Sequence, residues 1–222
     1  MKQDRNGVGV TVRSGEQMSD VGGTHLLVAI GRRPNTDDLG LDKAGVATDS
    51  RGYIVVDDEL RTGIPGIWAI GDCNGRGAFT HTSYNDFEIV AGNLLDKERR
   101  RVSDRIMAYA LYTDPPLGRA GMTEAEVRKT GKPALIATLP MENVSRAYEK
   151  GETTGFMKIL VDRDSEQILG ASLLGLSGDE VVHCVLDVMY AKASYKVLQR
   201  AMHIHPTVAE FIPTMLDDLR PL

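Results

Sequence analysis

The sequence predicts an α+β protein, with an antiparallel sheet and helices in its second half, preceded by remnants of an α/β region. Two observations support this fold class. Short apolar segments separated by turn residues, and then a strongly amphipathic helical stretch, fill residues 104–222. Ahead of them stand two continuous apolar runs that end in glycine, a pattern typical of strands buried on both faces. With 222 residues, 42% of them hydrophobic, the chain is long enough for one or two domains.

Residues 1–30 are expected to be the end of a sheet domain. Gly7–Val12 alternates like a strand, and Gly22-Gly23 indicates a turn. His25–Ile30 is a continuous apolar run, which predicts a strand buried on both faces. Such a strand needs neighbours that the preceding residues do not supply, so we expect the rest of its domain to precede this chain.

Residues 31–103 predict two more strands, a glycine loop and a helix. The strands are expected at 53–56 and 66–70, and the loop at 75–77. A helical pattern runs from 82 to 97 and presents one apolar face. That face consists of Phe87, Val90, Ala91, Leu94 and Leu95.

Residues 104–222 predict four strands and three helices. The strands are expected at 107–112, 134–139, 156–162 and 168–174. Asp162–Ser165 suits a hairpin turn. The helices are expected around the apolar stripe Val181, Val182, Val185, Leu186 and Met189, then at 195–202 and at 207–216. The change in pattern near residue 104 divides the chain into three parts, 1–30, 31–103 and 104–222.

Composition excludes several classes of protein. The net charge of −5 and the pI near 5.6 leave no overall basic surface for nucleic acid. No apolar stretch has the length that a bilayer requires and no signal peptide begins the chain, so we expect a cytoplasmic protein without membrane partners. Cys73 and Cys184 are too far apart in sequence to form a disulfide framework or a metal-binding pair, and each is expected in the core. We expect no metal site.

Gly71-Asp72 follows a predicted strand and precedes a glycine loop and a helix. A carboxylate at the end of a strand can accept hydrogen bonds from the hydroxyls of a sugar or polyol. Glycines let backbone amides approach a ligand, and a helix start attracts negative charge. The alternative is that Asp72 only caps a turn, because Gly-Asp alone is a weak signal.

His205 and Glu210 pair an imidazole with a carboxylate five residues later in the segment HIHPTVAE. A histidine can move protons near neutral pH, and a carboxylate on its other ring nitrogen fixes its tautomer. The alternative is that Glu210 belongs to a capping box, because Thr207-Val208-Ala209-Glu210 fits the S/T-x-x-E pattern of a helix start.

Four motifs, in order, resemble those of the class I pyridine nucleotide–disulfide oxidoreductases, which are flavoenzymes. Leu27–Asn35 is similar to their ATGRxPN segment, and Ile67–Cys73 to their second FAD motif. Tyr112–Glu124 looks like the opening of their dimerisation domain, and His203–Glu210 like their C-terminal catalytic signature. The resemblance implies that the α/β remnants are nucleotide-binding. Residues 1–30 would be the tail of the NAD(P)-binding domain, and residues 31–103 would be part of the FAD-binding and central region. Residues 104–222 would be the dimerisation domain.

The resemblance implies roles for the matching residues. Asp72, presented by Gly71, would hold the ribityl chain of FAD. Thr80 and His81 would approach the pyrimidine end of the flavin, where helix amides stabilise negative charge. His205, with Glu210 behind it, would be the acid–base pair for a redox-active thiol of the other subunit. The implied assembly is a homodimer, whose substrate is a small molecule or a disulfide. We also expect the stripe of residues 181–189 near the dimer interface.

Within the family, Glu142–Ala147 and Gly178–His183 look closest to the mercuric reductase-like branch, followed by dihydrolipoamide dehydrogenase. The sequence Asp217–Leu222 lacks the vicinal cysteine pair of mercuric reductases, which argues against mercury reduction by that route.

The sequence also contains no GxGxxG for dinucleotide phosphates and no CxxxxC pair to exchange electrons with flavin. We therefore expect the C-terminal half of an FAD-dependent oxidoreductase that uses NAD(P)H. The isolated chain is expected to be inactive and to bind FAD weakly or not at all. Its acceptor would be a disulfide, a metal ion or another oxidant. The alternative is a stand-alone dimerisation or binding module without catalytic activity.

Overall fold

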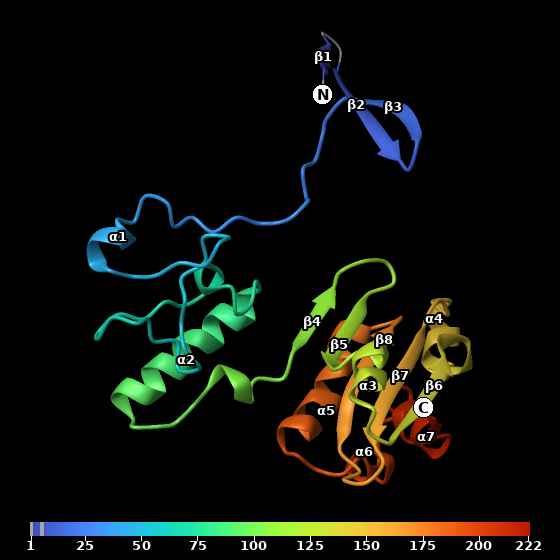
Figure 1. Cartoon of the computed structure of the whole chain (residues 1–222). Helices are drawn as coiled ribbons and strands as arrows, with labels where there is room; N and C mark the ends of the chain where they lie inside the picture. The colour runs from blue at the N-terminus through green and yellow to red at the C-terminus, as the bar shows by residue number, and fades with distance from the viewer. Residues whose placement is uncertain (1, 5–6) are drawn as a thin grey trace. The chain divides into compact units, whose positions relative to one another are not determined.

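The computed structural model describes residues 2–4 and 7–222. The chain forms two compact units, one of residues 1–57 and 61–78, the other of residues 58–60 and 79–222 (Figure 1). Among the described residues, no helix is both long and apolar enough to cross a membrane.

The first unit begins with an antiparallel three-stranded sheet, followed by chain with little regular structure. Its elements are β1 (Lys2–Asp4), β2 (Gly7–Ser14), β3 (Gln17–Gly23), α1 (Leu41–Ala44) and the 3₁₀ turn η1 (Asp72–Asn74). The strand predicted from Gly7 is confirmed. The turn predicted at Gly22-Gly23 is wrong, because both residues pair with β2 and the chain reverses between Ser14 and Gln17.

The strand predicted at His25–Ile30 is also wrong. These residues form no strand, and the side chains of Leu27 and Ile30 are 87% and 93% exposed. A run of this kind becomes a buried strand only when strands pair with it on both sides, and no described residue pairs with it. The strands predicted at 53–56 and 66–70 do not form. Only Ile54 and Trp68 of these segments make isolated β-bridges.

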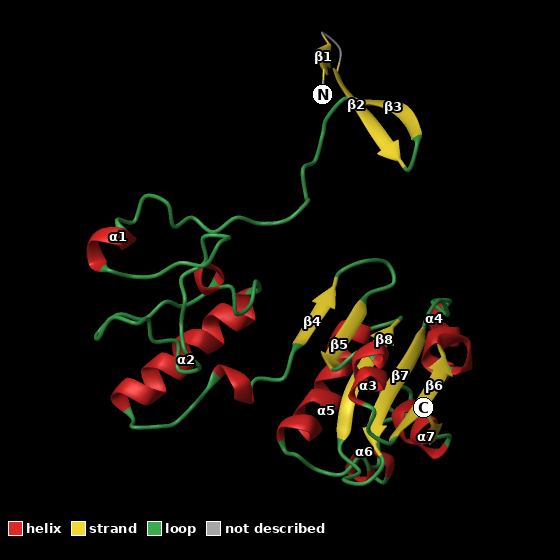
Figure 2. Ribbon diagram, in the orientation of Figure 1, coloured by secondary structure: helices red, strands yellow, loops and turns green. Residues whose placement is uncertain are grey.

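The second unit contains a six-stranded antiparallel sheet in the order β4-β5-β8-β7-β6-β9 (Figure 2). The strands are β4 (Ala108–Leu111), β5 (Leu117–Gly121), β6 (Ala134–Pro140), β7 (Phe156–Asp162), β8 (Ile168–Leu174) and β9 (Arg220–Pro221). The helices are α2 (Thr80–Leu95), α3 (Glu124–Thr130), α4 (Ser145–Lys150), α5 (Gly178–Tyr190), α6 (Lys196–Gln199) and α7 (Phe211–Asp217), with 3₁₀ turns η2 (Val102–Asp104) and η3 (Met141–Asn143).

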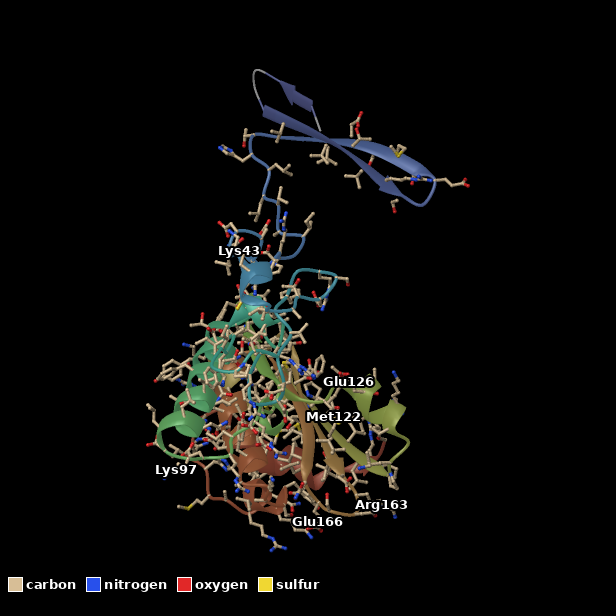
Figure 3. All side chains as sticks on the ribbon, turned by 60° about the vertical axis from the view of Figure 1, so that its left-hand side comes forward. Lys43, Lys97, Met122, Glu126, Arg163 and Glu166 are labelled. Atoms are coloured by element: carbon tan, nitrogen blue, oxygen red, sulfur yellow. The ribbon has the colours of Figure 1, made fainter. Side chains whose placement is uncertain are left out.

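Helices cover both faces of this sheet, because successive side chains along each strand point to opposite faces and both faces carry apolar residues. In β7, Met157 and Ile159 belong to the main core, which also includes residues of α5, α6 and α7. Leu160 belongs instead to a smaller core with Val127 of α3. Met122, labelled in Figure 3, packs against this smaller core just before α3 begins. The predicted α+β class and antiparallel sheet are thus confirmed.

Several predicted elements are confirmed closely. β7 and β8 have the expected bounds, and Asp162 Oδ1 accepts amide hydrogen bonds from Asp164 and Ser165 in the turn between them. The last two helices are shorter than predicted. β5 and α3 were not predicted from the sequence, although α3 begins with a capping box between Thr123 and Glu126.

On α2, the predicted apolar face needs correction. The buried positions include Asp86 and Ile89, whereas Phe87 and Leu95 of the predicted face are 49% and 78% exposed. The α5 stripe is partly buried against the main core. Val182 and Val185 are buried there, and the other three residues are half-buried: Val181, Leu186 and Met189.

Candidate functional site

His205 and Glu210 lie together at the entry to α7. Nδ1 of His205 is 3.0 Å from Oε2 and 3.2 Å from Oε1 of Glu210. The imidazole side chain is 73% exposed, whereas the carboxylate is only 16% exposed. The pair therefore consists of a presented ring and a sheltered partner, which solvent screens less than it would a surface carboxylate.

The capping box that offered the alternative explanation of Glu210 is also present. Oε1 of Glu210 accepts a hydrogen bond from the amide of Thr207 at 3.0 Å, and Oγ1 of Thr207 accepts one from the amide of Glu210 at 3.3 Å. Oγ1 of Thr207 also donates to the carbonyl of Ile204 at 2.7 Å. Val208, which is 4% exposed, anchors this turn in the main core. The box thus holds Glu210 in place for His205.

This arrangement determines what the ring can do. A carboxylate accepts hydrogen bonds, so the neutral His205 ring donates from Nδ1 and leaves the Nε2 lone pair for another group. That nitrogen can take a proton, and Glu210 then stabilises the charged ring. His203 makes a different contact, because its Nδ1 lies 3.2 Å from the carbonyl of Ala201.

Asp72 begins η1 directly after Gly71. Gly71 has φ 79° and Gly75 has φ 69°, so the loop reverses at backbone angles that favour glycine. Asn74 fixes the loop from inside, since its Nδ2 donates to the carbonyl of Ala69 at 3.0 Å. The Asp72 side chain remains 55% exposed, which leaves carboxylate oxygen available to a ligand.

Arg32 lies within the ATGRxPN-like segment, and the sequence alone did not indicate its role. Its Nη1 lies 3.4 Å from Oδ2 of Asp72 and donates to the carbonyl of Ala78. The arginine thus connects the ATGRxPN-like segment with the loop that carries Asp72. Its position in that motif was the signal that could have identified it.

Thr80 and His81 form the first turn of α2. Phe79, which precedes them, provides no side-chain acceptor for the helix amides. A helix start without such a cap can bind an electron-rich group. The Nε2 of His81 lies 2.9 Å from the carbonyl of Ala108, and its ring stacks on Phe79 with centroids 5.1 Å apart.

The structure brings some of the predicted site residues together and leaves others apart. His205 contacts Glu210, and Gly71-Asp72 and Thr80-His81 each form a local group. In the described part of the chain, no hydrogen bond or ring contact joins His81 to His205. The same residues contain no cluster of three or more side chains suited to a metal.

Family models cover most of the chain. The dimerisation domain of the pyridine nucleotide-disulphide oxidoreductases matches residues 107–216. The pyridine nucleotide-disulphide oxidoreductase model matches residues 1–86.

Individual relatives agree with these models. The Escherichia coli protein named "Probable pyridine nucleotide-disulfide oxidoreductase RclA" is 39% identical over 83% of this chain and 42% of its own length. Mercuric reductase from Streptomyces lividans is 32% identical over 95% of this chain and 44% of its own length. A solved structure of E. coli RclA, described as an HOCl-induced flavoprotein disulfide reductase, matches with a TM-score of 0.88 and 35% identity, over 97% of this chain and 49% of that one.

This chain therefore spans less than half the length of the curated relatives to which it is similar. Two family models, matched in order, and the relatives' similarity together identify its ancestry: the chain belongs to the pyridine nucleotide-disulphide oxidoreductases, a family of FAD- and NAD(P)H-dependent flavoproteins, and carries their dimerisation domain.

Proposed function

We propose that this chain is part of an FAD-dependent oxidoreductase that passes electrons from NAD(P)H, through flavin and a cysteine pair outside this chain, to an oxidant. Its own contribution is an acid–base pair and a dimer interface. The observation that carries this proposal is the contact between His205 and Glu210, in which a sheltered carboxylate orients an exposed imidazole.

The proton chemistry of this pair suits a thiol. Nε2 of His205 would take the proton of a cysteine thiol, which leaves the more nucleophilic thiolate. Glu210 would stabilise the resulting imidazolium, and His205 would later return the proton to the departing sulfur. A positioned group of this kind accounts for about two to four decades in rate.

The residues assigned to FAD fit parts of that cofactor. FAD would supply the electron-carrying ring. The exposed carboxylate of Asp72, on a loop permitted by Gly71, would accept hydrogen bonds from ribityl hydroxyls. The uncapped start of α2, at Thr80 and His81, would face the pyrimidine end of the flavin, where its amides favour negative charge.

We further propose that the protein is a homodimer and that His205 serves the site of the other subunit. Met202 and Ile204, on either side of His203, are 98% and 79% exposed. These two exposed apolar side chains lie within the family's dimerisation domain, beside His205, and we assign them to the surface that the other subunit would cover.

In this proposal, residues 1–30, 31–103 and 104–222 are the tail of an NAD(P)-binding domain, part of an FAD-binding and central region, and the dimerisation domain. The electron acceptor is a disulfide, a metal ion or another small oxidant. The competing proposal is a dimerisation or binding module without catalytic activity.

Rapid-reaction kinetics on a full-length protein that contains this chain tests the proposal. His205→Gln should leave flavin reduction by NAD(P)H near the wild-type rate and slow reduction of a disulfide substrate by about two to four decades. Equal losses in both half-reactions would refute the acid–base role. A full-length wild-type protein with no flavin and no NAD(P)H oxidation would favour the binding module.

A further inference from the structure

A polar cavity of about 450 Å³ lies among α2, the connector that follows it and the end of α5. Asn85 and Ile89 of α2, Arg101 and Arg105 of the connector, and Tyr190 and Lys192 at the end of α5 contribute to its lining. None of the residues proposed above for flavin or for acid–base chemistry lines it. Its volume falls within the range of small-molecule sites, about 300–1,000 Å³.

The cavity carries an excess of positive charge. Four basic side chains line it, and two of them are neutralised: Arg105 pairs with the buried Asp86, and Arg100 lies 3.4 Å from Glu88. The other two, Arg101 and Lys192, form no ion pair with any described residue. Asp104 is the one acidic residue in the lining.

The nearby carboxylates are mostly engaged by other donors. Asp58 accepts from the amide of Ser103 at 2.9 Å and from its hydroxyl, while Glu88 also accepts from Asn85 Nδ2 at 2.9 Å. These hydrogen bonds leave the carboxylates charged, but neither carboxylate forms an ion pair with Arg101 or Lys192 in the described part of the chain.

Besides these charges, the cavity has hydrogen-bond donors that lack an acceptor in the protein. The Tyr190 hydroxyl accepts from the amide of Ile106 at 3.2 Å, which leaves its own proton free to be donated. Nη1 of Arg105 is buried and has no hydrogen-bond partner, although the rest of that guanidinium is bound by Asp86 and Asn85. This nitrogen is closed off from solvent, so the donors open to a ligand are the Tyr190 hydroxyl and the two unpaired basic side chains.

The positions of these groups are set by the fold. Arg105 Nε donates to Asn85 Oδ1 at 3.0 Å, which connects the connector with α2. The backbone of Lys192 is fixed on both sides, since its amide donates to the carbonyl of Met189 at 3.0 Å and its carbonyl accepts from Gln167 at 3.1 Å. The backbone at Lys192 is thus fixed, while the side chains of Arg101 and Lys192 are exposed to solvent at the cavity.

We propose that this cavity binds a phosphate-bearing small molecule. The phosphate oxygens would accept from Arg101, Lys192 and the Tyr190 hydroxyl, because charge-assisted hydrogen bonds to phosphate suit these donors. The apolar surface of Ile89 and the Tyr190 ring would contact the organic part of the ligand. The site goes beyond the proposed redox function and does not depend on it.

Calorimetric titration of the 222-residue chain with pyrophosphate, at about 0.15 M salt, tests the proposal. Amide chemical shifts would show where the anion binds, and the largest changes should fall at Ile89, Tyr190 and Lys192. We expect one site per chain. The double variant Arg101→Gln/Lys192→Gln should bind at least about tenfold more weakly, because each lost partner is a hydrogen bond to a charged group.

The matched control is Lys97→Gln/Arg99→Gln, which removes the same charge from exposed positions after α2 that do not line the cavity. Lys97 is labelled in Figure 3. The affinity of this control variant should stay within about twofold of wild type, since at about 0.15 M salt charges more than about 8 Å from the anion are largely screened. Equal weakening in the two double variants, or no heat and no shifts with millimolar pyrophosphate, would overturn the proposal.

Thermal unfolding would show whether each variant folds. If Arg101→Gln/Lys192→Gln does not fold, Tyr190→Phe takes its place, because it removes one donor and no charge. It should weaken pyrophosphate binding by about threefold to tenfold, which is the worth of a single hydrogen bond. Unchanged affinity in a folded Tyr190→Phe variant would then refute the site.

Discussion

The carboxylate of Glu210 binds the ring of His205 and closes the turn before α7 at the same time. Its Oε2 lies 3.0 Å from Nδ1 of His205, and its Oε1 accepts from the amide of Thr207 at 3.0 Å. The capping contact and the contact with His205 looked like alternatives in the sequence, but both are present because a carboxylate has two oxygens. A substitution that preserves one contact and alters the other can therefore separate the two roles.

Glu210→Gln is expected to separate them in the full-length enzyme. The amide oxygen of Gln can still accept from Thr207, so the free energy of unfolding should change by less than about 1 kcal/mol. The amide nitrogen, however, would favour the other tautomer of His205 and would not stabilise an imidazolium. Disulfide reduction should fall by about one to two decades, less than in His205→Gln.

Thr207→Val is the matched control for that experiment. It removes the hydroxyl that accepts from Glu210 and donates to Ile204, but it leaves the carboxylate beside His205. We expect a loss of about 1 kcal/mol in urea unfolding and a much smaller change in turnover. If Glu210→Gln left turnover at the wild-type rate, the carboxylate would be only a helix cap.

The chain is expected to be a dimer at micromolar concentration, as sedimentation equilibrium can show. Ile204→Asp should weaken the dimer, because it places a charge within an exposed apolar segment that we assign to the interface. Leu95→Asp is the control, since Leu95 is 78% exposed but lies outside the dimerisation domain. A monomeric wild-type chain, or equal effects of the two substitutions, would contradict the interface assigned here.

The 222-residue chain should bind FAD weakly or not at all. Glycine-rich loops anchor the pyrophosphate of a dinucleotide, and this sequence contains no GxGxxG. Absorbance of the purified chain would measure bound flavin, and a stoichiometric yellow protein would disprove the expectation. In a full-length protein, Asp72→Ala should release FAD more readily than Asp72→Asn, because Asn retains an oxygen that can accept from a hydroxyl.

Cys184 should react slowly with thiol reagents in the folded chain. Burial raises the pKa of this thiol, and its Sγ lies 2.9 Å from the carbonyl of Val181 as a donor. The thiol thus stays protonated at pH 8, where a free cysteine begins to ionise. In a Cys73→Ser background, labelling should be slow until denaturant is added. Fast labelling of the native protein at pH 8 would contradict this environment.

Because the pKa of Cys184 is raised by folding, we expect the stability of the folded chain to fall as the pH rises above about 8.5. The pKa of Cys184 is higher in the folded chain than in the unfolded chain. The thiol therefore makes its full contribution to the free energy of unfolding below about pH 8.5. That contribution should be lost as the pH rises, because the unfolded chain ionises first. Urea unfolding between pH 8 and pH 10 would show the decline, and Cys184→Ser should reduce it.

The sequence alone determined the elements that depend on local pattern. The β7–β8 hairpin was predictable because two apolar segments flank a turn whose Asp162 side chain binds the following amides. The helix α5 was predictable because its apolar stripe has helical spacing over several turns. The four family motifs were also readable, since they consist of adjacent or closely spaced residues.

Only the tertiary structure decided which partner each pattern meets. His25–Ile30 has the composition of a buried strand, but pairing with other strands determines whether it becomes one. On α2, the predicted face of Phe87 and Leu95 is largely exposed. The helix instead buries a face that includes Asp86, because the pairing of Asp86 with Arg105 offsets the cost of burying a charge. The sequence pattern identified both helices, yet it could not tell that the stripe of α5 packs on its own sheet.

For the candidate site too, the residues could be predicted from the sequence, whereas their contacts could not. The sequence named His205 and Glu210, because their spacing and residue types suit proton transfer. It could not choose between a cap and a catalytic partner, since both use the same carboxylate. The fold shows that Glu210 lies within reach of two donors at once, and that buried Val208 anchors the turn while the ring of His205 stays exposed.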